Sequence, residues 1–184
     1  AVEILQKAVS ETAVQVTLRL TSRIKQPVDL LQIGLTLTLN GRYQNVRYYG
    51  MGETESYSDF SAQDVMGVYR TAVPDMFVPY IKPQESGNRS GVRWAEITDD
   101  AGGGLRLTAL GQPLHFKAVD VDEENLCKAR HMEDVERLDQ TVLHINGFMR
   151  GIGSQSCGPD TAEPFKKLLH FGETAAYSFL LELL

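Results

Sequence analysis

The sequence predicts an all-β protein, an antiparallel sandwich of sheets with one short helix. Hydrophobic residues alternate with polar ones at residues 14–20 and 33–39, and a period of two is typical of strands with one buried face. Short candidate strands follow one another along the chain, with turn residues between them. This order favours packed antiparallel sheets over the strand–helix–strand units of a parallel sheet.

Turn residues connect the candidate strands. Asn40 and Gly41 directly follow the second alternating stretch, and this dipeptide favours the positive φ angles of a tight hairpin, with a return strand expected at residues 43–49. An Asp-Asp-Ala-Gly-Gly-Gly run at residues 99–104 predicts a second hairpin turn. The remaining candidate strands are residues 92–98, 105–110, 114–119, 141–147 and 176–183.

One helix is predicted, at residues 123–132, with Asp122 as its N-cap. The acidic side chains at residues 120–124 suit the positive end of a helix dipole better than a calcium loop, which needs a central glycine. Cys127 and His131 would share one face of this helix. No other Cys/His pair has matching spacing, so the sequence predicts no metal site.

Composition and charge disfavour several classes of protein. The chain has 184 residues and a net charge of −6, which disfavours binding to a nucleic-acid backbone. No apolar run approaches the roughly 18 residues of a membrane helix, and the N-terminus has no signal-peptide pattern. Two cysteines fit a reducing compartment, so we expect a cytoplasmic protein. Because the chain does not begin with Met, we also expect a fragment of a longer protein.

Residues 50–90 have weak periodicity and many Gly, Pro, Tyr, Asp and Ser residues. A stretch of this length without strong elements is uncommon in a compact domain unless it is functional or packs on a partner. Trp94, just after it, offers a ring for sugar stacking, but its position within a strand favours the core. The carboxylates available for the acid pair of a glycosidase, each more often a surface group, are Glu53, Glu55, Glu85 and Glu96.

Four sequence blocks, taken in order, carry a family resemblance. Residues 48–59 read YYGMGETESYSD and are followed by Phe60; residues 78–89 read VPYIKPQESGNR; Val-Arg-Trp follows at residues 92–94; and residues 151–159 read GIGSQSCGP. These blocks resemble the last domain of β-galactosidases of glycoside hydrolase family two, over roughly residues 10–184. The first block departs from the family pattern by having Glu53 for Pro and Phe60 for Arg.

The resemblance implies an antiparallel super-sandwich similar to the galactose-mutarotase fold, of which residues 1–184 form the C-terminal part. It also implies that the catalytic glutamates and the magnesium and sodium sites lie in a separate barrel domain, so this chain carries no catalytic residue and no cofactor. The 151–159 loop would reach the mouth of the active site, where the expected substrate-binding residues are Gln155, Ser156 and Cys157. Some relatives have Trp at the last position; a thiol there lines a pocket without stacking on the sugar.

The favoured interpretation is a β-galactosidase segment that shapes the active-site rim and supports subunit packing, and that is inactive alone. Its expected partners are the barrel domain, a small sugar and further copies of the complete enzyme, with neither nucleic acid nor membrane. Asn146 stands where the family usually has Asp, and Met149 where it has Gln or His. Two alternatives stay open: a non-catalytic galactoside-binding module and, less favoured, an aldose epimerase that would use one of His115, His131, His144 and His170 with a carboxylate.

Overall fold

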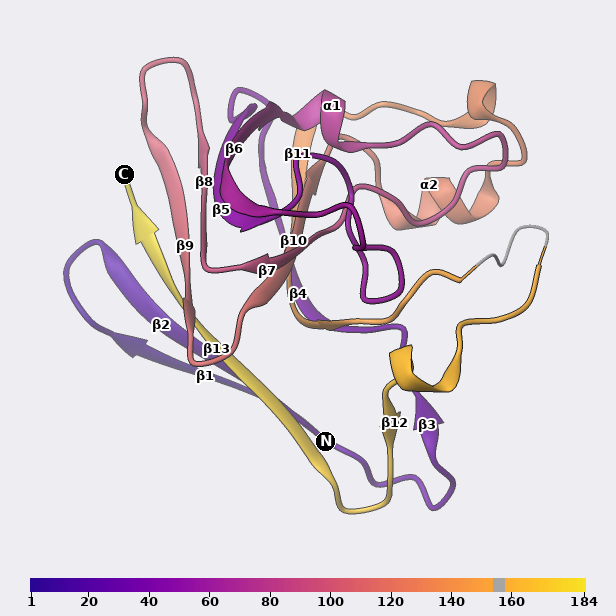
Figure 1. The fold of residues 1–184 in the computed structure, drawn as a ribbon. Helices are drawn as coiled ribbons and strands as arrows, with labels where there is room; N and C mark the ends of the chain where they lie inside the picture. Colours follow the sequence, from indigo (N-terminus) through magenta and orange to yellow (C-terminus); the bar gives the residue numbers. More distant parts are fainter. Residues whose placement is uncertain (154–157) are drawn as a thin grey trace.

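The computed structural model describes residues 1–153 and 158–184, which form a two-layer β-sandwich (Figure 1). The larger sheet has the order β1 (Val2–Ala8), β2 (Ala13–Thr21), β13 (Thr174–Leu183), β9 (Gly104–Leu110), β8 (Trp94–Thr98), β5 (Asn45–Met51) and β6 (Met66–Ala72). The smaller sheet has the order β4 (Gln32–Asn40), β11 (Gln140–Met149), β10 (Leu114–Val119) and β7 (Arg89–Val92). A short pair joins β12 (Leu168–Leu169) to β3 (Val28–Asp29). All these pairings are antiparallel, which confirms the predicted fold class.

The hydrophobic core lies between the two large sheets. Phe116 and Ile145 of the smaller sheet are fully buried, in one cluster with Tyr48 and Tyr177 of the larger sheet. The Tyr48 and Phe116 rings meet edge to face, with centroids 5.4 Å apart. The Tyr177 hydroxyl donates to the Ile145 carbonyl at 2.8 Å, which satisfies that phenol inside an apolar layer.

The outer face of the smaller sheet is polar and nevertheless buried. Side chains alternate along a strand, so the residues beside Phe116 and Ile145 point away from the core. Lys117 pairs directly with His144 across β10 and β11, and these residues are 3% and 2% exposed. Residues 50–90, predicted to be functional or to pack on a partner, supply part of this cover, because Glu85 contacts Lys117. The same segment also contains β6 and the one-turn helix α1 (Val73–Met76), which the sequence did not predict.

The hairpin predicted at Asn40 and Gly41 is wrong. The strands on either side belong to different sheets, since β4 pairs with β11 and β5 pairs with β6 and β8. Neither residue has a positive φ angle. A Cβ atom at position 41 would lie 2.9 Å from the backbone of Asp139, so close packing at the crossing between sheets explains this glycine. The return strand begins at Asn45 instead of residue 43.

The strand predicted at residues 92–98 is two strands in two sheets. β7 ends at Val92 and β8 begins at Trp94, so the chain crosses between the layers at Arg93. The Arg93 backbone stays paired, donating to Tyr49 O and accepting from Ala109 N, both at 2.8 Å. By contrast, the predicted turn at residues 99–104 is confirmed, because β8 and β9 pair directly around it.

The predicted helix is confirmed at its start and is shorter at its end. The Asp122 carboxylate accepts a hydrogen bond from the Asn125 amide at 2.6 Å, as expected of an N-cap, and α2 runs over Glu123–Lys128. It ends there because the Asp134 carboxylate accepts the amides of Arg130 and His131, each at 3.0 Å, and a short 3-10 turn follows at Met132–Asp134. Across the described residues, no helix is long and apolar enough to cross a membrane.

Candidate functional site

The first two sequence blocks hydrogen-bond to each other. Glu55, only 5% exposed, accepts from the Tyr80 hydroxyl and, at 2.9 Å, from the Gly87 amide. The Asn88 side chain donates to the Ser56 carbonyl at 2.6 Å, and Ser56 N donates back to the Asn88 carbonyl at 2.8 Å. Burial and the hydrogen bond to Glu55 raise the pKa of Tyr80 above its usual range, so this phenol is a donor at neutral pH.

A second link between these blocks reaches the polar face of the smaller sheet. The buried Tyr57 hydroxyl donates to Glu85 Oε1 at 3.1 Å, and Lys117 Nζ lies 2.5 Å from Glu85 Oε2. Burial, with the neighbouring carboxylates, raises the pKa of Tyr57 well above normal. Arg89 adds a third link, because its Nε donates to the Tyr48 hydroxyl at 2.9 Å. The first two blocks therefore form one buried polar unit.

Asp59, the last residue of the first block, joins this unit to the glycine-rich block. Its Oδ1 accepts from the Ile152 amide at 3.0 Å, and its Oδ2 accepts from the Gly153 amide at 2.7 Å. A Cβ atom at Gly151 would lie 2.4 Å from Asp59 Cγ, so only glycine permits this approach. Asp59 matched the family pattern in the sequence, but sequence analysis gave it no role in the site. The available signal was an acidic residue at the end of the first block and glycines at the start of the last block, since a carboxylate can accept hydrogen bonds from the amides of a glycine-rich loop.

Arg150 and Thr161 also fix the backbone around Gly151, in addition to the Asp59 contact. Arg150 lies 3.0 Å from Asp29 and also pairs with Asp160, while the Thr161 hydroxyl donates to the Gly151 carbonyl at 2.6 Å. Lys166 adds a contact of 3.1 Å to Asp160. Residues 150–153 and 160–161, which flank the predicted substrate-binding loop, are therefore fixed to each other and to the sandwich.

The predicted substrate-binding residues Gln155, Ser156 and Cys157 lie outside the described residues. The two nearby departures from the family pattern are described. Asn146 is 2% exposed, and its amide lies 3.5 Å from Gln32 Oε1. Met149 is 4% exposed and lines a pocket beside the loop. Asn146 thus lies within the fold, whereas Met149 borders this pocket.

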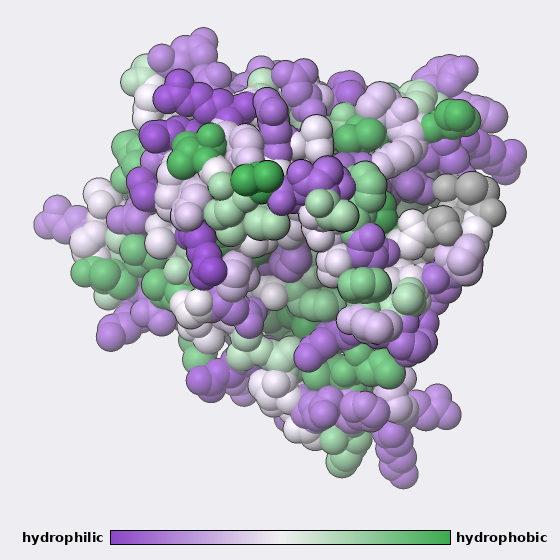
Figure 2. All heavy atoms as spheres, in the orientation of Figure 1, coloured by the Kyte–Doolittle hydropathy of each residue, from purple (hydrophilic) through white to green (hydrophobic). Residues whose placement is uncertain are grey.

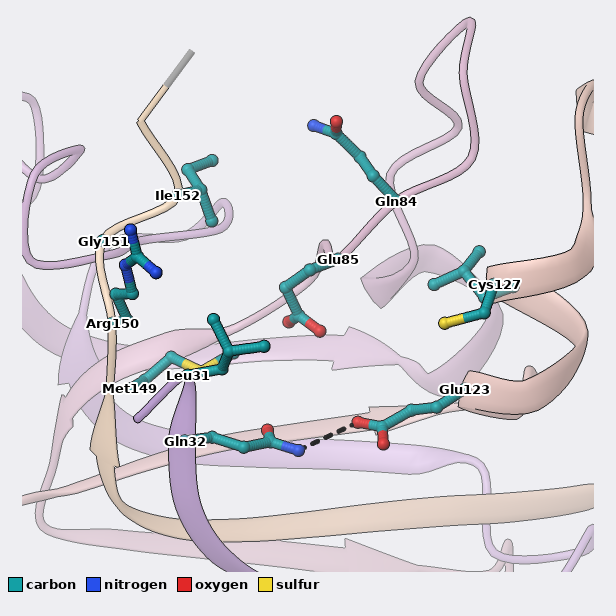
Figure 3. Close-up of a pocket in the computed structure, with 11 residues that line it drawn as sticks. Leu31, Gln32, Gln84, Glu85, Glu123, Cys127, Met149, Arg150, Gly151 and Ile152 are labelled. Carbon is teal, nitrogen blue, oxygen red and sulfur yellow. Dashed lines mark hydrogen bonds between the residues drawn. The ribbon is translucent and has the colours of Figure 1, made fainter. Parts of the chain in front are cut away.

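That pocket has a volume of about 290 Å³ and opens next to Ile152 (Figure 3). Its walls come from the start of β4, the end of β11, α2 and the second sequence block. The Glu85 side chain points into it, opposite Leu31 and Met149. The lining residues are Leu31, Gln32, Gln84, Glu85, Glu123, Leu126, Cys127, Met149, Arg150, Gly151 and Ile152.

A row of polar contacts runs along one side of the pocket. Gln32 Nε2 donates to Glu123 Oε1 at 3.1 Å, as the dashed line in Figure 3 marks. The same carboxylate oxygen lies 3.7 Å from Nδ1 of the buried His144, which is hydrogen-bonded to Thr36 at 3.2 Å. Burial and the nearby Lys117 charge lower the pKa of His144 to about 4, so this ring is neutral at neutral pH.

The candidate carboxylates do not resemble a glycosidase acid pair. Glu55 and Glu85 both serve as acceptors within the polar unit. Glu96 lies on the larger sheet, 2.9 Å from Arg106 and 3.6 Å from Arg47, and Glu53 is exposed. Among the described residues, no cluster of His, Cys, Asp and Glu is arranged to hold a metal ion. The contacts of these glutamates support the architecture of the chain and do not supply a pair of reacting groups.

The core position predicted for Trp94 is wrong. Ala95 and Ile97 of β8 are fully buried, so Trp94, on the alternate face, points out of the sandwich and is half-buried. Its indole lies beneath the guanidinium groups of Arg47 and Arg106, at 5.2 and 4.9 Å from the ring centroid. These cation–π contacts stabilise the ring on the outer face, where the pattern alone could not place it.

Comparisons with known proteins agree with the sequence blocks. A family model described as "Beta galactosidase small chain" matches residues 5–181. The β-galactosidase of Streptococcus thermophilus is 33% identical over 152 residues, which cover 82% of this chain and 15% of that protein. The β-galactosidase of Lactobacillus delbrueckii subsp. bulgaricus is 42% identical over 125 residues, 68% of this chain and 12% of that protein. The chain thus spans less than a sixth of these relatives, and it belongs to the β-galactosidase small chain family.

Proposed function

We propose that this chain is the C-terminal β-sandwich segment of a β-galactosidase and that it shapes the rim of the active site. In this proposal, the loop at residues 151–159 presents Gln155, Ser156 and Cys157 to the terminal galactosyl group of a lactose-type substrate. The observation that carries the proposal is the Asp59 contact with Ile152 and Gly153, because two of the sequence blocks that carry the resemblance meet there, at the base of this loop.

The chemistry itself is assigned to another domain. Hydrolysis of a glycosidic bond needs an acid and a base or nucleophile on two carboxyl groups. Three described carboxylates near the loop, Asp59, Glu55 and Glu85, accept hydrogen bonds from backbone amides, phenols or Lys117 and are not arranged as an acid and base facing an open site. We therefore propose that the catalytic glutamates, with the magnesium and sodium ions, lie in a barrel domain, and that the complete enzyme is a cytoplasmic homo-oligomer in which this chain supports subunit packing.

A chimeric enzyme tests the proposal. In the Streptococcus thermophilus β-galactosidase, the segment that matches this chain is either deleted or replaced by this chain. We expect hydrolysis of a nitrophenyl β-galactoside by the chimera and none by the deletion variant or by this chain alone. Robust turnover by the isolated chain, or full activity of the deletion variant, would contradict the assignment.

Of the four histidines open to the epimerase alternative, His144 is tested first, because its ring lies 3.7 Å from the Glu123 carboxylate. That ring is 2% exposed and hydrogen-bonded to Thr36, so it is poorly placed to exchange protons with a sugar. We expect no acceleration of the optical-rotation change of fresh α-galactose by this chain. Acceleration that disappears in His144→Gln would instead favour the epimerase.

A further inference from the structure

We propose that the pocket between β4, β11, α2 and the second sequence block binds a neutral, monosaccharide-sized sugar. The geometry joins three properties that together select this class of ligand: a small volume, cations that are already paired, and hydrogen-bonding groups set opposite apolar walls. The inference concerns residues outside the 154–157 loop and does not need the proposed function to hold.

The volume limits the ligand to a small molecule. At about 290 Å³, the pocket lies at the lower end of the range for ligand sites. A single pyranose ring, with about a dozen non-hydrogen atoms, is of this size, whereas a disaccharide would extend into solvent.

The charges around the pocket disfavour an anion. Arg150, on one wall, lies 3.0 Å from Asp29 and also pairs with Asp160. Lys117, which contacts the pocket through Glu85, lies 2.5 Å from that carboxylate. Besides Arg150, the charged side chains that line the pocket are Glu85 and Glu123, and both are acidic. An incoming phosphate or carboxylate would therefore meet paired cations and two carboxylates.

The polar groups of the wall match the hydroxyl groups of a sugar. Ionised carboxylates accept about four hydrogen bonds each. Tyr57 and Lys117 use two positions on Glu85, and Gln32 uses one on Glu123, so both retain capacity for hydroxyl donors. Gln84 adds a side-chain amide at the upper wall, where Figure 3 shows it above Glu85. Lys117 holds Glu85 and Gln32 holds Glu123, so both carboxylates are positioned before a ligand arrives.

Apolar side chains form the other walls. Leu31, Met149 and Ile152 lie on one side, and Leu126 lies on α2. A pyranose has hydroxyl groups on its edge and C–H groups on its face, so it can satisfy both kinds of wall at once. A purely apolar ligand would instead shield from water the acceptor positions of Glu85 and Glu123 that Tyr57, Lys117 and Gln32 leave open, which is costly.

Titration of the isolated chain tests the proposal. Amide chemical shifts are followed by NMR as D-galactose or D-glucose is added, with sorbitol as an open-chain polyol and ethanolamine as a cation. A ligand of this size is expected to bind with a Kd on the order of a few millimolar. Saturable shifts confined to β4, α2 and residues 149–152 support the proposal. Saturation by ethanolamine alone, or equal affinity for sorbitol, overturns the sugar assignment.

Two variants with a matched control locate the site. Glu123→Gln keeps the size of a half-exposed side chain and should weaken binding about tenfold, because one charged acceptor is lost. Cys127→Phe places a ring in the pocket from an exposed position and should abolish binding. Glu124→Gln changes the next carboxylate on α2, which faces Lys128 and does not line the pocket, and should leave binding unchanged.

The outcomes separate this inference from the proposed function. Absence of saturable shifts with either sugar, or equal weakening by Glu123→Gln and Glu124→Gln, overturns the pocket assignment even if the chimeric β-galactosidase is active. Sugar binding that follows the expected order of variants supports the pocket even if the chimera is inactive. Unchanged thermal melting of each variant shows that the comparison is between folded proteins.

Discussion

At the scale of single residues, the Asp59 carboxylate has two amide donors and a glycine packed against it. A hydrogen bond to a charged group contributes roughly 1.5–3 kcal/mol. Because Asp59 is half-buried, solvent takes over part of this interaction when the carboxylate is removed. We expect Asp59→Ala to lower the free energy of unfolding of the chain by about 2 kcal/mol in urea denaturation.

Control variants distinguish this effect from a general loss of charge. Asp75→Ala removes an exposed carboxylate on α1 and should change stability by less than about 0.5 kcal/mol. Gly151→Ala should resemble Asp59→Ala, since its new Cβ would lie 2.4 Å from Asp59 Cγ. Equal stability of all three variants would show that the contact of Asp59 with the Ile152 and Gly153 amides does not stabilise the fold.

Two histidines, the buried His144 and the half-buried His115, make stability depend on pH. Burial lowers the pKa of His115 to about 4, and burial with the Lys117 charge lowers the pKa of His144 to about 4. In the unfolded chain both rings titrate near ~6.5. Between these values the unfolded chain binds more protons, so folding stability is retained above pH ~6.5 and falls as the pH approaches 4. The loss is at most about 3 kcal/mol for each ring.

Urea denaturation at a series of pH values measures this dependence. His115→Gln should reduce the slope of stability against pH between about 4 and 6.5, while the same change at the exposed His170 should not. A slope that is unchanged in both His115→Gln and His144→Gln would mean that other groups cause the acid sensitivity.

At the scale of elements, local patterns predicted strands well and their connections less well. The alternating stretches became β2 and β4, the glycine run after Asp99 became a hairpin, and Asp122 capped α2. The Asn40–Gly41 turn failed because a dipeptide signal is local, whereas β4 finds its partner about a hundred residues later in β11. Similarly, β1 was not predicted: all its residues are exposed, so its sequence need not alternate between apolar and polar residues.

The candidate site was predicted only as a set of sequence blocks. Their order identified the family, but the pairs that connect them, such as Glu55 with Tyr80 and Asp59 with Ile152, depend on contacts between distant segments. Nothing in the local sequence distinguishes a carboxylate that accepts backbone amides from one that reacts with a sugar. The three-dimensional contacts supply that distinction.

Close packing at Gly41 gives a direct test of the crossing between sheets. Gly41→Ala would bring a Cβ within 2.9 Å of the Asp139 backbone, and overpacking of this kind typically costs about 1–3 kcal/mol. Gly103→Ala meets nothing closer than 3.7 Å and should be tolerated. Thermal denaturation of both variants measures the difference. Equal melting temperatures would favour the simple hairpin over the observed crossing.

At the scale of the whole molecule, β1 lies at the edge of the larger sheet with hydrophobic side chains exposed. Ile4 and Leu5 are 49% and 47% exposed, and Figure 2 shows apolar patches among the polar surface of one face. Open edge strands of this kind promote association between chains. We expect the isolated chain to self-associate at high concentration in light scattering. Ile4→Lys with Leu5→Lys should suppress this, while Ile81→Lys, on a loop residue that is 96% exposed, should not.

The most direct test of the account concerns the loop base in a working enzyme. In the chimeric β-galactosidase, kcat and KM for a nitrophenyl galactoside are measured for Asp59→Ala and for Asp75→Ala. If Asp59 holds a loop that contacts the sugar, KM rises about tenfold in the first variant and is unchanged in the second. A lower kcat at unchanged KM in Asp59→Ala would mean that the contact only keeps the protein folded, and would contradict the proposed role at the active-site rim.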